Sequence, residues 1–74
     1  MNSKAKYEDI LEKVGTNIRF LRKKKSMTIK ELALKSGINP NYLADIERGK
    51  RNPSVKSLQK IASGLKVKIY RFFN

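Results

Sequence analysis

The chain has 74 residues, enough for one domain, and a domain of this size buries only about 60% of its unfolded surface, which argues against a deep catalytic cleft. It contains no cysteine and no histidine, so disulfides, thiol chemistry and the usual zinc ligands are excluded. Eighteen Lys and Arg against six Asp and Glu give a net charge of +12 and a pI near 10.3, which indicates a nucleic-acid binder or, alternatively, a basic ribosome- or membrane-associated protein.

The N-terminal part of the chain predicts one long helix. Residues 1–6 are polar and basic without apolar periodicity, so we expect a flexible N-terminus, followed by a single domain over residues 7–74. From Tyr7 onward, apolar residues recur at spacings of three and four, which is typical of one buried helical stripe. The stripe consists of Tyr7, Ile10, Leu11, Val14, Ile18 and Leu21.

Two residues do not fit this simple pattern. Gly15 lies inside the stripe and predicts a bend or a helix start at that point, because glycine costs about 1 kcal/mol relative to alanine in a helix. Phe20 falls roughly opposite the stripe. Its ring is expected to pack on the C-terminal segment or, alternatively, to contact another subunit. The lysine run 23–25 is typical of a solvated helix end, and Ser26 ends the helix.

A capping signal predicts the second helix, over about residues 28–36. Thr28 with Glu31 three residues later forms a capping box, in which each side chain satisfies a backbone N–H of the other residue. Gly37 then supplies a turn, because glycine readily adopts the left-handed conformation that ends many helices.

The third helix is predicted over about residues 40–48. Asn39 can cap it, and Pro40 occupies the first helical position, where its missing N–H costs nothing. Two helices joined by a short turn that contains glycine form a helix-turn-helix. In DNA-binding versions of this motif the second helix lies in the major groove.

The C-terminal third predicts two further helices. After a basic loop over residues 49–53, Ser54 can cap a fourth helix, and Gly64 is the expected C-cap. Its apolar face consists of Val55, Leu58, Ile61, Ala62 and Leu65. The aromatic-rich end should form a short fifth helix, docked against the first helix or against a second subunit. The sequence therefore predicts an all-α fold with five helices.

The third helix divides into two faces. Leu43 and Ile46, with Ile38 from the turn, should point into the core. The outward residues can read base edges, because Asn pairs with adenine, Ala contacts the thymine methyl and Asp accepts from cytosine. The candidates for base readout are Pro40, Asn41, Ala44 and Asp45. The alternative for Asn41 and Asp45 is an ordinary solvated helix face, and Asp45 can equally pair with Arg48 or Lys50.

A second set of residues is placed to contact phosphates. Two of them cap the second and third helices, one lies in the first turn of the third helix, and the others lie at its end and in the basic loop. Phosphate contacts from these positions would orient the protein on DNA without reading its sequence. They are Thr28, Asn39, Tyr42, Arg48, Lys50, Arg51 and Asn52. The alternative for Tyr42 is that its ring packs between the second and third helices.

Four segments carry a resemblance to a known family. They are Met27-Thr-Ile-Lys-Glu-Leu-Ala, Ser36-Gly-Ile-Asn-Pro-Asn-Tyr-Leu, Ile46-Glu-Arg-Gly-Lys-Arg-Asn-Pro-Ser and Leu58-Gln-Lys-Ile-Ala. Together they resemble the XRE or Cro/cI-type helix-turn-helix regulators over about residues 14–73. The short length and the aromatic ending are also similar to the controller proteins of restriction–modification systems, which are small dimers that regulate their own operon and the endonuclease gene.

The resemblance implies a compact, lambda-repressor-like DNA-binding domain and several residue roles. It implies an ion pair between Arg22 and Glu47, and a homodimer formed through the C-terminal helix. The dimer residues would be Tyr70, Phe72 and Phe73. Two positions depart from the family: Ile29 replaces a glutamine that often contacts a phosphate, and Pro40 stands where many relatives have a base-reading side chain.

These observations predict a sequence-specific regulator of transcription. It would bind double-stranded DNA as a homodimer on a palindromic operator and control a restriction–modification operon, with a contact to RNA polymerase if it activates. The alternative is an antitoxin or regulator-inhibitor that acts mainly by binding another protein. No cofactor, metal or catalytic motif is indicated, so we do not expect an enzyme. Without an apolar run long enough to span a bilayer or a signal peptide, we expect a cytoplasmic protein with no membrane partner.

Overall fold

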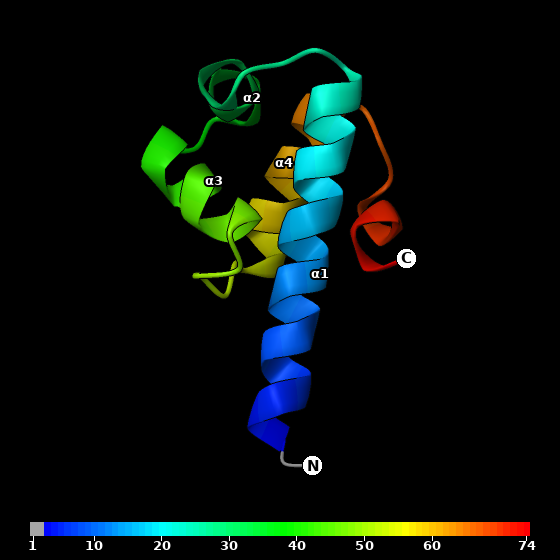
Figure 1. Cartoon of the computed structure of the whole chain (residues 1–74). Coiled ribbons are helices and arrows are strands. Elements are labelled where there is room, and N and C mark those ends of the chain that lie inside the picture. Colours follow the sequence, from blue (N-terminus) through cyan, green and yellow to red (C-terminus); the bar gives the residue numbers. More distant parts are fainter. Residues whose placement is uncertain (1–2) are drawn as a thin grey trace.

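The computed structural model describes the backbone of residues 3–74 and the side chains of residues 9–74. The elements are α1 (Ser3–Lys24), α2 (Ile29–Ser36), α3 (Pro40–Glu47), α4 (Val55–Leu65) and a 3-10 helix, η1 (Ile69–Phe73) (Figure 1). No strand forms within residues 3–74. The predicted all-α fold is confirmed, with the correction that the fifth helix is a short 3-10 helix.

The helices enclose one apolar core. α1 packs on α3 with one side and on η1 with the other, while α2 packs on α4 and α3 (Figure 1). The fully or nearly fully buried apolar residues are Val14, Ile18, Leu21, Leu32, Ala33, Leu43, Ile46, Leu58, Ile61, Ala62, Leu65 and Phe72. The N-terminal half of α1 projects beyond the other helices (Figure 1). Among the described residues, no helix combines the length and apolar composition needed to cross a membrane.

The structure corrects the first helix in two respects. α1 is already helical at Ser3, four residues before the expected start, while residues 1–2 lie outside the described part and the flexibility of residues 1–6 stays a prediction. Gly15 neither bends nor begins the helix. A Cβ atom at Gly15 would lie 2.4 Å from the Ile46 carbonyl oxygen and 2.6 Å from that of Glu47. This glycine is therefore required for the close approach of α1 and α3.

The fourth helix also differs from the expectation. Gly64 lies inside α4, where a Cβ would meet Ser36 Oγ at 2.3 Å, so this glycine allows α2 and α4 to approach and is not the C-cap. The cap is Lys66, which adopts the left-handed conformation at φ 58°. Val55, expected on the apolar face, is 75% exposed at the first position of α4.

The aromatic end of the chain is docked on α1. Phe72 is completely buried, and Asn17 donates hydrogen bonds from Nδ2 to the carbonyl oxygens of Phe72 (2.9 Å) and Asn74 (3.1 Å). The expectation that Phe72 forms a dimer contact is therefore wrong, because its ring fills the core of its own subunit. Tyr70 and Phe73 remain 59% and 49% exposed.

Candidate nucleic-acid interface

The predicted caps of α2 and α3 are present. Thr28 Oγ1 accepts from the Glu31 N–H at 3.0 Å, and Glu31 Oε1 accepts from the Thr28 N–H at 2.8 Å. These hydrogen bonds lower the pKa of Glu31, chiefly through the bond from the Thr28 backbone. Gly37 ends α2 at φ 68°, and Asn39 Oδ1 accepts from the N–H groups of Asn41 and Tyr42. Both caps use the side-chain oxygen as an acceptor, which leaves the Thr28 hydroxyl hydrogen and the Asn39 amide group to donate to a phosphate.

The inner face of α3 is fixed to the core as expected. Leu43 and Ile46 are buried to 0% and 1% exposure, and the half-buried Ile38 packs against the same cluster. The close approach at Gly15 presses the C-terminal end of α3 onto α1. α3 is therefore held rigidly, with its other face directed outward.

A buried ion pair fastens this crossing. Arg22 Nε and Nη2 donate to Glu47 Oε2 and Oε1 at 2.7 and 3.0 Å, while Arg22 Nη1 donates to the Met27 carbonyl oxygen at 2.8 Å. The two side chains are 10% and 4% exposed, and the hydrogen bonds to Glu47 raise the pKa of Arg22. The pair implied by the family resemblance is thus present as a bidentate contact, which orients α3 relative to α1.

The predicted base-reading residues lie on the outward side of α3. Pro40 and Asn41, at the start of the helix, are exposed, while Ala44 and Asp45 are half-buried. Asn41 offers its amide to solvent at the end of the helix that usually meets base edges. These four residues share one surface, and their role as base contacts stays a prediction.

Asp45 forms ion pairs within the chain. Its Oδ1 accepts from Arg48 Nη2 at 2.7 Å, and its Oδ2 lies 3.6 Å from Arg51 Nε. Arg48 was one of the two expected partners of the Asp45 carboxylate. The other expected partner, Lys50, bonds to Asp45 through its backbone N–H, which donates to the Asp45 carbonyl oxygen, and Arg51 takes its place beside the carboxylate. Such exposed pairs contribute only about 0–1 kcal/mol, so a phosphate can displace the carboxylate at little cost.

Tyr42 joins α3 to α4. Its hydroxyl donates to Ser57 Oγ at 3.2 Å, and its ring lies 5.5 Å from the Arg51 guanidinium carbon. The half-buried ring packs against the core cluster, and its packing between the second and third helices stays a prediction, while the engaged hydroxyl argues against a direct phosphate contact. Sequence reasoning missed Ser57 because its contact with Tyr42 spans fifteen residues and follows no local pattern.

The remaining candidates line the loop after α3. Lys50, Arg51 and Asn52 are all exposed, beside the exposed Arg48 at the end of α3. The structure thus brings three cations to one edge of the α3 surface, where their positive charge would favour phosphate binding.

A helix-turn-helix family model, HTH_3, matches residues 18–72. The chain is 42% identical over 62 residues to the HTH-type transcriptional regulator SlrR of Bacillus subtilis strain 168, a match that covers 82% of this chain and 41% of SlrR. The chain therefore spans about two fifths of that relative.

Solved structures of smaller proteins match almost end to end. The restriction–modification controller protein C.AhdI of Aeromonas hydrophila is 35% identical, with a TM-score of 0.83 over 85% of this chain and 96% of C.AhdI. The controller protein C.Esp1396I is 42% identical, with a TM-score of 0.80 over 86% of this chain and 83% of its own. C.Esp1396I has also been solved as a tetramer on its natural 35-base-pair operator.

Proposed function

The chain belongs to the helix-turn-helix family of DNA-binding transcription regulators, and we propose that it reads a palindromic operator as a homodimer and controls a restriction–modification operon. The proposal assigns the major groove to α3 and assigns no catalytic reaction to the chain.

One observation carries the proposal: α3 is anchored on its inner side and presents a short polar face outward. Leu43 and Ile46 are buried, the Arg22–Glu47 pair fixes the C-terminal end, and Asn41 stands exposed at the start. A rigid helix with its N-terminal residues exposed is what docking into a major groove requires. We assign adenine recognition to Asn41 and a thymine-methyl contact to Ala44.

The loop after α3 is proposed to supply most of the affinity. Arg48, Lys50 and Arg51 would contact phosphates on either side of the groove, and Asp45 would keep the two arginines in place before DNA arrives. If a dimer makes about six to ten phosphate contacts, its affinity falls by about three to five orders of magnitude between about 50 and 200 mM salt.

The proposed dimer surface is the exposed part of the C-terminal segment. Tyr70 and Phe73 present large apolar side chains to solvent, and Phe73 borders a small hollow of about 60 Å³ shared with Ile10 and Pro53. Burial of these rings against a second copy would remove apolar surface from water. A palindromic site requires the two copies of α3 to lie about one turn of DNA apart.

The control of a restriction–modification operon is supported by similarity to controller proteins of about the same length. The chain covers 96% of C.AhdI and 83% of C.Esp1396I, whereas it covers only 41% of SlrR.

The test is selection of bound duplexes from a random pool, followed by gel-shift titration of the selected and a random duplex at two salt concentrations. We expect a palindromic consensus, a preference for the selected duplex at both salt concentrations, and a solution mass of two chains. Equal affinity for the two duplexes would contradict sequence-specific regulation. A monomeric mass in the DNA complex would contradict the dimer. Phe73→Ser should lower the solution mass toward one chain, whereas the matched control Leu34→Ser, which alters an exposed apolar residue on α2, should leave it unchanged.

A further inference from the structure

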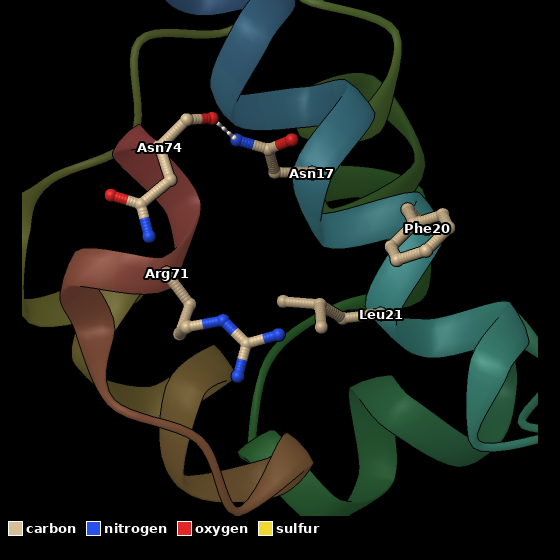
Figure 2. A pocket seen from close by; sticks show the side chains of 5 residues that line it. All are labelled: Asn17, Phe20, Leu21, Arg71 and Asn74. Atoms are coloured by element: carbon tan, nitrogen blue, oxygen red, sulfur yellow. Dashed lines mark hydrogen bonds between the residues drawn. The ribbon is translucent and has the colours of Figure 1, made fainter.

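An exposed aromatic residue on α1 is used by neither the core nor the proposed DNA surface. Phe20 was expected to pack on the C-terminal segment or to contact another subunit, and it is 61% exposed. It lies at the rim of an open pocket of about 160 Å³ between α1 and η1, which is lined by Asn17, Phe20, Leu21, Arg71 and Asn74. Figure 2 shows the Arg71 side chain extending from η1 toward Leu21 across this pocket.

The pocket lies on the side of α1 opposite α3. At about 100° per residue, Gly15 and Arg22 face α3, whereas Asn17, Phe20 and Leu21 centre on the reverse side. α1 accordingly runs between α3 and η1 (Figure 1). A regulator whose α3 occupies a major groove would therefore still expose this pocket to another molecule.

The charged side chains around the pocket are positive. Arg71 lines it, Lys24 follows Phe20 by one helical turn on the same side of α1, and Lys68 precedes Arg71 by one turn of the 3-10 helix. The nearest carboxylate before Phe20 along α1 is Glu12, eight residues or about 12 Å away. The carboxylates of Glu31, Asp45 and Glu47 belong to α2 and α3, where they are engaged in a cap or in ion pairs.

We propose that this pocket, which we name the Phe20 pocket, docks an acidic protein segment that inserts one large apolar side chain. Its volume is close to the cavity of about 150 Å³ that is known to hold benzene, so one aromatic or branched side chain fits. The cations around it select carboxylates on the same segment. The partner is bound while α3 contacts DNA, which gives the regulator a surface for a second protein.

Two other occupants fit the chemistry less well. A second copy of this chain is strongly basic, with 18 cations against 6 carboxylates, and complements the basic rim of this pocket poorly. The proposed dimer uses Tyr70 and Phe73, which share a face of the 3-10 helix that differs from the face of Arg71. A nucleobase would bring polar ring edges into a pocket where the Asn17 amide already donates to the Phe72 and Asn74 carbonyl oxygens. The Arg71 guanidinium and the Asn74 side-chain amide would remain to pair with those edges, and any polar edge left unpaired is costly to bury.

The experiment titrates the full-length ¹⁵N-labelled chain with a short synthetic peptide that is rich in glutamate and carries one central phenylalanine. Amide chemical shifts report the site, and fluorescence anisotropy of the labelled peptide reports affinity. We expect saturable binding, with shifts concentrated at Asn17, Phe20, Leu21 and Arg71. Phe20→Ser should weaken binding by about tenfold or more, as for an aromatic anchor of an interface. Arg71→Glu should also weaken it.

Three controls separate this site from general electrostatic attraction. A peptide with serine in place of phenylalanine should bind at least about tenfold more weakly, and one with lysine in place of glutamate should not bind. Leu34→Ser removes an apolar residue that is 84% exposed on α2 and should leave binding unchanged. Because the Phe20 and Arg71 side chains are exposed, both variants should keep the wild-type circular dichroism spectrum.

Several outcomes would overturn the proposal. Equal binding of the phenylalanine and serine peptides would reduce the site to charge alone. Pocket shifts produced by single-stranded DNA and not by the peptide would assign it to nucleic acid, and dissociation of a dimer by Phe20→Ser would assign it to a second copy. The result is independent of operator binding, because Phe20→Ser should bind the selected duplex with wild-type affinity whatever the peptide does.

Discussion

Two ion pairs in this protein have the same shortest distance and very different surroundings. The Arg22–Glu47 and Arg48–Asp45 pairs each have an N···O distance of 2.7 Å. The side chains of the first pair are 10% and 4% exposed, and those of the second are 57% and 31% exposed. Comparison of Glu47→Gln with Asp45→Asn therefore tests whether burial, rather than distance, sets the effect on stability.

Burial predicts a large difference between the two variants. Glu47→Gln leaves the Arg22 charge buried without a counter-charge, which costs about 3–5 kcal/mol. Asp45→Asn removes two exposed contacts, to Arg48 at 2.7 Å and to Arg51 at 3.6 Å, and exposed pairs contribute only about 0.2–1 kcal/mol each. A chain of 74 residues has a free energy of unfolding of about 4–11 kcal/mol, so the first change removes a large share of it and the second hardly any.

Urea unfolding followed by circular dichroism measures both effects. Double-mutant cycles with Arg22→Gln and Arg48→Gln give the coupling energy of each pair, which should be several-fold larger for the buried one. If Glu47→Gln does not fold, Arg22→Lys replaces it, because lysine keeps the charge, loses the bidentate fork and should destabilise less. The reasoning is refuted if the buried pair couples no more strongly than the exposed pair.

Three further predictions concern recognition, packing and pH. Asn41→Ala should reduce the preference for adenine at one operator position by about 1–3 kcal/mol in the gel-shift assay. Arg51→Ala should weaken binding to all duplexes alike in the same assay, and the reverse pattern would contradict the assigned roles. Gly64→Ala should lower the midpoint of thermal unfolding, because the added methyl group would lie 2.3 Å from Ser36 Oγ, and an unchanged midpoint would show that the two helices can separate freely. Folding lowers the pKa of Glu31 below its ordinary 4.5, so the stability contributed by its cap should be complete above about pH 4.5 and should decline as the pH falls through the lower folded pKa. Glu31→Gln should reduce this pH dependence of the free energy of urea unfolding. An identical pH profile for the variant would exclude the cap as its source.

Local signals predicted most of the helices well. The capping box at Thr28, the glycine turn at Gly37 and the Asn39 cap are properties of a few neighbouring residues, and each is present in the structure. The inward face of α3 followed from periodicity alone, because a short amphipathic helix must bury its apolar side. These predictions needed no knowledge of how the helices pack.

Predictions failed where the outcome depended on a distant partner. Gly15 and Gly64 were interpreted as a bend or helix start and a cap, yet each marks a close approach between two helices that no local pattern reveals. Phe72 was assigned to a dimer surface, whereas docking of η1 on α1 places its ring in the core. Aromatic residues at the end of a chain look alike in sequence, and only packing separates a buried ring from an exposed one.

The sequence by itself determined that this is a basic, all-helical domain with a helix-turn-helix at its centre, because charge, capping and apolar periodicity are local or additive properties. The tertiary structure decided which polar groups remain available. It paired Asp45 with Arg48 and Arg51, engaged the Tyr42 hydroxyl with Ser57, and left Phe20 exposed beside a basic pocket. Those outcomes depend on which side chains distant segments bring within hydrogen-bonding distance, and that follows only from packing.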